Sequence, residues 1–329
     1  MLIATLPTLT GDHSLTLAEK IIQHPYVDAV RYNTGGDSPY TPRQILETLN
    51  PLAEKYGKAL YVDLEGRQIR VARWSPHSRG AVTLNRDFEI TLPARIHFRR
   101  AGWFEIVGAD PKGRKIFFSP RKTRQEYYFG ETQSVHVVAK EFKVKGYLGG
   151  FDFEYIEAAA ELGINKFMLS FVECFKDIDE FLVACYNVGT DQPLKAPGLV
   201  LKIESIKGVE FVRNFPANPA KGSTDFKLMT ARDDLFLGFV DRRHEFLDAL
   251  KLIAEKDPDA IVASRIMSGL ESYGEVTIGD MADLVLMRRL GYQHFMFSDE
   301  LSDSFDLAMD EWQKVAIPIL QKIENGLYA

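Results

Sequence analysis

Short apolar runs alternate with longer segments of helical periodicity along most of the chain. Eight runs have the length and composition of buried strands: 2–5, 27–31, 59–63, 166–170, 198–203, 226–231, 260–263 and 293–297. Helices are expected between them at 14–24, 41–57, 152–162, 177–187, 241–256, 277–290 and 304–324. In the segment 41–57, Thr41 is a suitable cap, Pro42 suits the first turn and Gly57 ends the pattern. This alternation predicts an α/β fold, a (β/α)8 barrel, although a doubly wound sheet gives a similar one-dimensional pattern.

The segment from Val71 to Leu148 interrupts the alternation. It is rich in β-branched and aromatic residues, contains turn-forming stretches such as GADPKGR and lacks a long helical period. We therefore expect a barrel made of residues 1–70 and 149–329, with a small β-rich lid domain, 71–148, inserted after the third strand. The stretches RIHFRR and KGRKIFFSPRKTR give this insert a concentration of positive charge. They form either a cationic face for an anionic ligand or ordinary solvated charges on edge strands.

Composition excludes several classes of function. The chain of 329 residues is 46% apolar and 26% charged, as in globular proteins, and its formal charge of −6 argues against nucleic acid or an anionic membrane as a partner. Cys174 and Cys185 fit neither a disulfide framework nor a zinc knuckle. The N-terminus does not read as a leader, and no apolar run reaches the roughly eighteen residues of a membrane span. We expect a soluble, cytoplasmic protein.

Polar residues gather where the predicted strands end, which is where a (β/α)8 barrel places its active site. Five strand ends carry Arg31, Asn33, Asp63, Arg70, Lys202, Glu204, Arg232, Asp234 and Ser264. Each of these residues alone has an ordinary explanation, such as a helix cap or a surface ion pair. Their convergence on one rim is what indicates a functional site.

The stretch LVLKIESIKGVEF, residues 199–211, places Lys202 and Glu204 two positions apart, so both side chains point to one face of a strand. Glu204 and Asp234, on consecutive predicted strands, are suited to a divalent cation such as Mg²⁺ or Mn²⁺. A lysine beside that cation would stabilise charge on an enolate or a transferred phosphoryl group. A simple buried ion pair between Lys202 and Glu204 is the structural alternative. Walker, dinucleotide-binding, HExxH and GxSxG motifs are absent.

Taken in order, these motifs resemble those of the pyruvate kinase family, a (β/α)8 barrel with a lid-like β domain inserted after the third strand. VRYNTGG is similar to that family's R-x-N-x-S-H-G, DLEGRQIR to D-T-K-G-P-E-I-R, and SFVE to its S-F-V. LKIES, TARDDL and ASRIM are similar to K-I-E, A-R-G-D-L and A-T-Q-M-L. The resemblance extends over nearly the whole chain. It implies a Mg²⁺-dependent phosphotransferase that interconverts phosphoenolpyruvate and ADP with pyruvate and ATP.

The resemblance also implies roles for individual residues. Arg31 and Arg70 would contact phosphates, Lys202 would stabilise phosphoryl and enolate charge, and Glu204 with Asp234 would hold the divalent metal. The implied substrate-binding positions are Arg232, Asp233, Ser264 and Lys145. The implied nucleotide-binding positions are Thr5, Pro7, Arg31 and Asn33.

Several positions depart from the family. Of the residues that form its potassium site, Asn33 and Asp63 remain but Gly35 replaces the serine, so the K⁺ site is in question. Gly36 replaces a histidine. Five further replacements, whose formal charges cancel, introduce Glu65, Arg67, Gln68, Asp233 and Arg265. Charge that is redistributed without a net change favours an altered substrate over simple decay of the site.

Two other functions fit these departures. A metal-dependent lyase or aldolase would stabilise a pyruvate enolate without a nucleotide, and a pyruvate kinase-like sensor or scaffold would not be catalytic. The segment GLESYGEVTIGD lacks the family's P-T-R-A-E, and the sequence stops after the eighth helix, before the family's C-terminal domain. We therefore expect no effector regulation through such a domain, and a homo-oligomer stays open.

Overall fold

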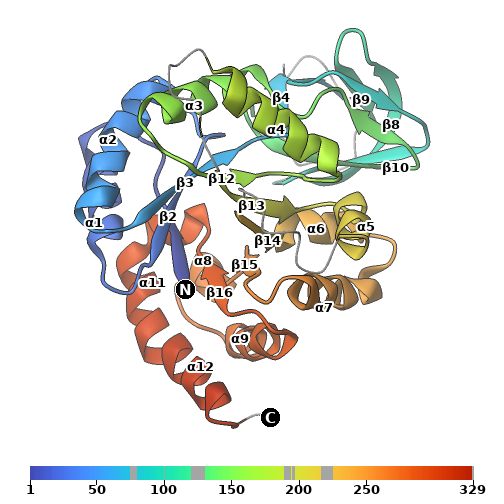
Figure 1. Cartoon of the computed structure of the whole chain (residues 1–329). Coiled ribbons are helices and arrows are strands. Elements are labelled where there is room, and N and C mark those ends of the chain that lie inside the picture. The colour runs from blue at the N-terminus through green and yellow to red at the C-terminus, as the bar shows by residue number, and fades with distance from the viewer. Residues whose placement is uncertain are drawn as a thin grey trace. The chain divides into compact units, whose positions relative to one another are not determined.

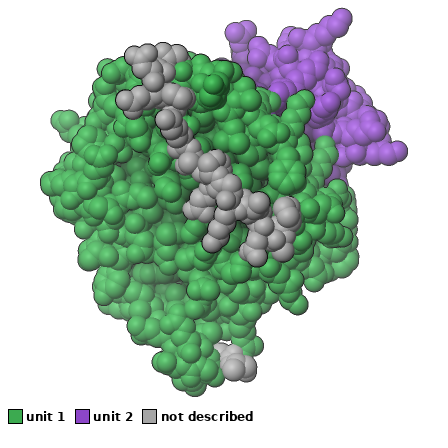
Figure 2. Space-filling view, viewed as in Figure 1, with its two compact units in different colours: residues 1–34, 38–64, 153–329 green, residues 35–37, 65–152 purple. Residues whose placement is uncertain are grey.

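A computed structural model of the chain describes residues 1–74, 80–99, 101–119, 130–188, 194, 197–215 and 225–327. These residues form two compact units, shown in different colours in Figure 2: residues 1–34, 38–64 and 153–329, and residues 35–37 and 65–152. The second unit is longer than the expected insert, 71–148. It includes residues 65–70 because β4 (Ile69–Arg73) pairs with strands of that unit, and it also includes 149–152.

The first unit contains a closed barrel of eight parallel strands, in agreement with the predicted (β/α)8 fold (Figure 1). In barrel order the strands are β1 (Leu2–Thr5), β2 (Ala29–Asn33), β3 (Ala59–Leu64), β12 (Lys166–Leu169), β13 (Gly198–Ile203), β14 (Asp225–Ala231), β15 (Ile261–Ala263) and β16 (His294–Met296). β16 pairs with β1 and closes the ring, which excludes the doubly wound alternative, because a doubly wound sheet is open. All eight strands lie within two residues of the predicted positions.

The described residues also form α-helices, several of which lie around the outside of these strands in Figure 1. They are α1 (Asp12–Gln23), α2 (Pro42–Lys55), α3 (Gly150–Glu161), α4 (Phe175–Asn187), α5 (Ile206–Arg213), α6 (Arg232–Gly238), α7 (Phe246–Lys256), α8 (Ser268–Tyr273), α9 (Ile278–Leu290), α10 (Asp299–Asp303), α11 (Phe305–Glu311) and α12 (Ile317–Glu324). The short helices α5, α6, α8 and α10 were not expected from the sequence. No helix in the described ranges is long and apolar enough to cross a membrane.

Two helices show how local sequence sets the boundaries. Thr41 caps α2 as predicted: its Oγ1 accepts the Gln44 amide at 3.3 Å, and its own amide donates to Gln44 Oε1 at 2.9 Å. The single helix expected at 304–324 is instead α11, a π-helical turn (Trp312–Ala316) and α12. Pro318 explains this break, since proline has no amide hydrogen to continue the α-helical ladder.

The barrel interior is filled by a cluster of apolar side chains to which every strand contributes. These residues are Ile3, Ala29, Tyr61, Met168, Val200, Met229, Ile261, Ala263 and Met296. Because side chains alternate between the two faces of a strand, the residues two positions later also face the barrel axis, nearer the carboxyl ends of the strands. The functional site is built from that next layer.

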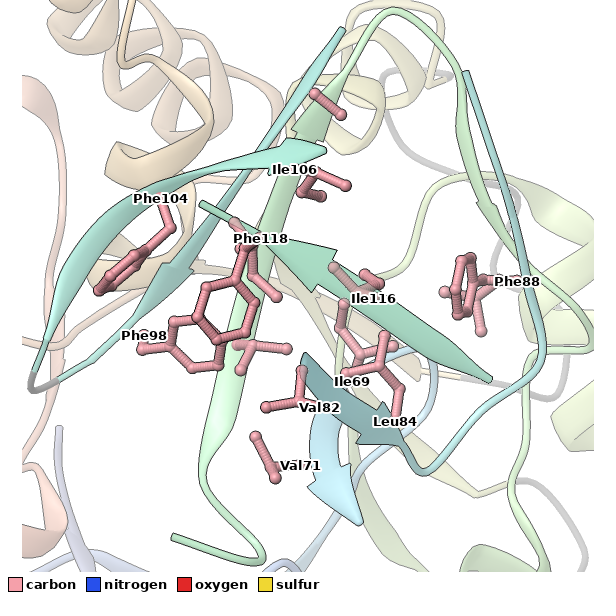
Figure 3. Close-up of a cluster of buried hydrophobic side chains, with 14 residues drawn as sticks. Ile69, Val71, Val82, Leu84, Phe88, Phe98, Phe104, Ile106, Ile116 and Phe118 are labelled. Atoms are coloured by element: carbon pink, nitrogen blue, oxygen red, sulfur yellow. The ribbon is translucent and has the colours of Figure 1, made fainter. Parts of the chain in front are cut away.

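The second unit has its own core inside a closed, antiparallel barrel. Its strands, in barrel order, are β10 (Ser134–Ala139), β4, β5 (Ala81–Leu84), β9 (Lys115–Phe118), β8 (Gly102–Asp110) and β7 (Ala94–Phe98). A separate pair consists of β6 (Phe88–Ile90) and β11 (Phe142–Val144). Figure 3 shows the buried cluster, in which Phe98, Phe104 and Phe118 pack together. The basic stretches noted above include Arg100 and residues 120–124, which lie outside the described residues, so the cationic face stays a prediction.

Candidate active site

Side chains at the carboxyl ends of the barrel strands form one buried polar network. Arg31, Asp63, Ser170 and Lys202 follow the core residues Ala29, Tyr61, Met168 and Val200 by two positions each. All four are buried. The period of two along each strand therefore carries these polar groups onto the inner face, directly beyond the apolar layer.

Lys202 is held by three polar side chains. Its Nζ donates to Ser170 Oγ at 2.8 Å and to both oxygens of Asp63 at 3.1 and 3.2 Å, and it lies 3.4 Å from Glu204 Oε1. Burial by itself lowers the pKa of Lys202, but the charges of Asp63 and Glu204 outweigh burial and raise that pKa above its ordinary value. The side chain is therefore a fixed positive charge and not a proton acceptor at neutral pH.

Asp63 joins Lys202 to Arg31. Arg31 Nε donates to Asp63 Oδ2 at 2.6 Å, and Arg31 Nη1 donates to Thr5 Oγ1 at 3.0 Å. Burial alone would raise the pKa of Asp63, yet Lys202 and Arg31 together hold that pKa below its usual value. One ionised carboxylate thus orients two buried cations toward the same end of the barrel.

Glu204 directly follows β13, and its two carboxylate oxygens have different partners. Its Oε1 lies 3.4 Å from Lys202 Nζ. Its Oε2 accepts the backbone amide of Phe171 at 2.8 Å, in a turn where Phe171 adopts a left-handed φ of 54°. Burial raises the pKa of Glu204 to about 7, against the opposing effect of Lys202, and the charge of Asp234 contributes to the rise. Asp234 is half-buried in the first turn of α6. A cation near this pair would relieve their repulsion.

The charge balance of this network fits a divalent metal. Arg31 and Lys202 supply two positive charges, whereas Asp63, Glu204, Asp234 and Asp299 supply four negative charges when ionised. The excess of two negative charges equals the charge of one Mg²⁺ or Mn²⁺ ion. Among the described residues no group of three or more His, Cys, Asp or Glu side chains is arranged to hold a metal, so water and substrate oxygens would complete the shell of such an ion.

Arg232, which we expected to bind substrate, forms hydrogen bonds with the turn after β15 and with α9. Its Nε and Nη2 donate to the backbone carbonyl of Ser264 at 2.9 and 2.7 Å, and its Nη1 donates to Asp283 at 2.7 Å. The turn that it holds is unusual, because Ser264 and Arg265 both have positive φ angles, of 66° and 57°. Arg232 therefore positions the loop that carries Ser264.

Two of the departures from the family resemblance are partners of each other. Asp233 forms an ion pair with Arg265 in the first unit. In the second unit, Arg70 forms an ion pair with Glu65 and donates to Gln68 Oε1 at 2.5 Å and to the Thr132 carbonyl at 2.9 Å. The opposite signs of these replacements were the signal in the sequence that could have indicated the pairing.

Gly35 also belongs to the second unit, where the Arg70 guanidinium fills the space beside it. A Cβ added at Gly35 would lie 2.0 Å from Arg70 Nη2 and 2.9 Å from Glu65 Oε1. A serine cannot replace Gly35 without displacing Arg70. In the first unit, Asn33 Nδ2 lies 3.4 Å from Asp299 Oδ1, and both Asp63 oxygens accept from Lys202. The residues present do not fit a monovalent-ion site of the family type.

Of the three remaining expected site residues, two lie in the first unit and one lies in the second. Thr5 is buried in β1 and donates to the Phe297 carbonyl at 2.8 Å, and Pro7 is half-buried just beyond β1. Lys145 is exposed in the second unit, 3.9 Å from Glu89. The sequence reading missed Ser170 and Asp299 as members of the network. Ser170 could have been found, because it follows the core residue Met168 by the strand period of two.

No protein-family model matches the sequence, and no curated protein matches it either. Solved structures do match. The crystal structure of Cryptosporidium parvum pyruvate kinase superposes with a TM-score of 0.69 at 15% identity, covering 94% of this chain and 68% of that chain. A second structure of a pyruvate kinase from the same organism gives a TM-score of 0.67 at 14% identity, with 94% and 67% coverage. The chain therefore has a pyruvate kinase-like fold.

Proposed function

We propose that this protein is a divalent-metal-dependent phosphotransferase that interconverts phosphoenolpyruvate and ADP with pyruvate and ATP. The observation that carries the proposal is the buried Lys202 ammonium, which Asp63, Ser170 and Glu204 hold at the carboxyl end of the barrel. Side chains at this end are where (β/α)8 enzymes perform their chemistry. A permanent, oriented positive charge is what an enolate-forming reaction requires.

The chain's own residues have distinct parts in the proposed reaction. In phosphoryl transfer the bond between phosphorus and the enol oxygen breaks, a bond to the terminal phosphate oxygen of ADP forms, and the electron pair stays on the enolate, whose methylene carbon then takes a proton from water to give pyruvate. Lys202 stabilises that oxygen without giving up its proton, because its pKa is raised. Arg31, oriented by Asp63 and Thr5, binds the phosphoryl oxygens. Glu204 and Asp234 would hold the divalent metal, which supplies Lewis-acid neutralisation of phosphate charge when bound.

The test is pyruvate formation from phosphoenolpyruvate, ADP and Mg²⁺. We expect Lys202→Met to lower kcat about 100- to 1,000-fold, the effect of removing one preorganised stabilising group. Lys166→Met is the matched control, because Lys166 is the first residue of β12 and lies at the opposite end of the barrel strands. Equal losses in both variants, or wild-type activity in Lys202→Met, would count against the proposal.

Metal binding distinguishes the role of Lys202, in β13, from that of Glu204, the residue that follows this strand. Glu204→Gln should weaken Mn²⁺ binding at least tenfold, because it removes a ligand, whereas Lys202→Met should leave Mn²⁺ binding intact or slightly tighter. Electron paramagnetic resonance of free Mn²⁺ measures both. If the two variants lose stability equally and bind Mn²⁺ like the wild type, Lys202 and Glu204 are only a structural ion pair.

The residues at the positions of the family's potassium ligands do not fit a monovalent-ion site. The reaction rates in K⁺ and in tetramethylammonium should therefore be the same.

Enolate chemistry without a nucleotide is the second candidate, and one observation favours it. Asp299 places a carboxylate 3.4 Å from Arg31 Nη1, where a nucleotide phosphate is expected, whereas the Lys202 network is complete. Oxalate, a mimic of the pyruvate enolate, distinguishes the two. Oxalate binding in the presence of Mg²⁺ without any ADP binding would favour a lyase or aldolase, and binding of neither would favour a non-catalytic protein.

A further inference from the structure

Asp299 is the first residue of α10, which follows β16 after Phe297 and Ser298, and it faces the anion-binding side chains of the proposed site. Its Oδ2 lies 3.4 Å from Arg31 Nη1, and its Oδ1 lies 3.4 Å from Asn33 Nδ2. The Asp299 side chain is 50% exposed, whereas that of Arg31 is 8% exposed. A solvent-accessible carboxylate therefore covers part of a buried guanidinium.

Two other contacts of the Arg31 guanidinium are shorter than its contact with Asp299. Its Nε donates to Asp63 at 2.6 Å and its Nη1 to Thr5 at 3.0 Å, and no described residue accepts a hydrogen bond from Nη2. The contact with Asp299 is the longest and the most exposed of the set. Half-exposed ion pairs of this length are weak, so an arriving anion can displace the Asp299 carboxylate.

The neighbourhood of Asp299 is acidic as a whole. Glu300 and Asp303 belong to the same short helix, and the pKa of Asp303 is raised by burial and by the charges of Asp299 and Glu300. A free polyphosphate that approaches Arg31 meets this negative field. A polyphosphate neutralised by a divalent cation meets much less repulsion.

We propose that Asp299 is a specificity-determining residue that occupies the anion-binding edge of Arg31 and Asn33 in the free protein. The site would thereby accept phosphate groups complexed with a divalent cation and reject the uncomplexed anions. This inference rests on the proposed function, since it assumes that Arg31 binds substrate phosphate. The competing structural explanation is that Asp299 only complements the dipole at the start of α10.

The experiment is calorimetric titration with inorganic pyrophosphate, with and without Mg²⁺. Asp299→Asn should bind free pyrophosphate about five- to tenfold more tightly than the wild type, and Mg²⁺-pyrophosphate less than about twofold more tightly. Asp306→Asn is the control, because it removes the same charge from a carboxylate on α11 that pairs with Lys20 at 2.5 Å. That control should bind both ligands like the wild type.

Each outcome of the pyrophosphate titrations either supports the proposed role of Asp299 or overturns it. The inference is overturned if Asp299→Asn binds free pyrophosphate no more tightly than the wild type, including the case in which neither binds, or if Asp306→Asn gains as much. Asp299→Ser, which keeps a residue favourable at a helix start, repeats the test if the asparagine variant unfolds. Pyrophosphate binding requires no turnover. Loss of the proposed reaction with the selectivity intact would therefore reject the proposed function alone.

Discussion

At the scale of single residues, Asp63 is the residue on which the candidate site depends. It accepts from Arg31 Nε, from Lys202 Nζ and from Ser170 Oγ at 3.3 Å, while its side chain is 2% exposed. Two buried cations share this one carboxylate as their common close partner. The carboxylate that resembles a potassium ligand in the sequence is thus, in the structure, a partner of a lysine and an arginine.

Asp63→Asn should be strongly destabilising, because it leaves Arg31 and Lys202 buried with reduced compensation. We expect a loss of about 3–5 kcal/mol in the free energy of unfolding, measured by urea denaturation. Asp310→Asn is the control: it breaks an ion pair with Lys314 on the surface and should behave like the wild type. A small loss in Asp63→Asn, similar to that of the control, would mean that Arg31 and Lys202 do not depend on the Asp63 charge.

At the scale of secondary structure, local sequence patterns predict the connections between strands and helices less well than the strands and helices themselves. β14 ends at Ala231 and α6 begins at Arg232 without an intervening loop, so TARDDL reads as the end of a strand when it is also the start of a helix. This position turns Arg232 toward Ser264 and Asp283. Arg232 is consequently a residue that positions a loop in the structure, while its substrate-binding role stays a prediction.

In the second unit, Arg86 ties together two segments that are far apart in sequence. Its Nη1 donates to the Gly66 carbonyl, and its Nη2 donates to the carbonyls of Tyr147 and Leu148 at 3.0 and 3.1 Å. Arg86→Leu would leave these acceptors without the guanidinium and should cost about 1–3 kcal/mol. Hydrogen exchange at residues 66 and 147–148 should accelerate. Arg114→Leu, which removes a half-exposed arginine, should leave exchange there unchanged.

At the scale of the whole molecule, each unit has a core of its own. Nine residues fill the interior of the parallel barrel, and a separate cluster fills the antiparallel barrel (Figure 3). Units with separate cores can unfold in separate steps, so a single unfolding transition is not the expectation. Calorimetry should resolve two transitions, or one transition broader than a two-state process of the same enthalpy.

His136 of β10 should make an acid-sensitive contribution to the stability of the second unit. Burial lowers the pKa of His136 from 6.5 to about 4, so the folded state keeps this ring neutral while the unfolded chain takes up a proton. At this residue the unfolded state then binds more protons between pH 6.5 and 4, so the contribution of His136 to stability falls by roughly 3 kcal/mol through that window. Burial raises the pKa of Asp152 in the same unit to about 7, which acts in the opposite direction. His136→Leu should remove this loss, as seen in unfolding midpoints at pH 7 and pH 4.5.

The control for this prediction is His244→Leu, because the His244 side chain is 82% exposed. That variant should lose as much stability in acid as the wild type. An unchanged acid response in His136→Leu would show that other groups in the second unit govern its acid sensitivity.

Local sequence patterns are enough to predict the barrel strands, the capped start of α2 and the rim on which the polar residues lie. These features follow from local rules: the period of two along a strand, the lengths of apolar runs and the chemistry of Thr41 and Pro42. The same period carries Lys202 and Glu204 to one face. A resemblance at the level of short motifs then indicated the fold that the solved structures share.

The pairing of most charged side chains in the site depends on the three-dimensional fold. Asp63 contacts Lys202 across 139 positions of sequence and Asp299 contacts Arg31 across 268, and no local pattern encodes such distances. The pairing of Asp233 with Arg265, across 32 positions, likewise depends on turns that the fold brings together, whereas Glu65 and Arg70 pair within one local segment of the second unit. Closure of the barrel places the ends of β1 and β16 side by side, and it is this closure that brings Asp299 to Arg31.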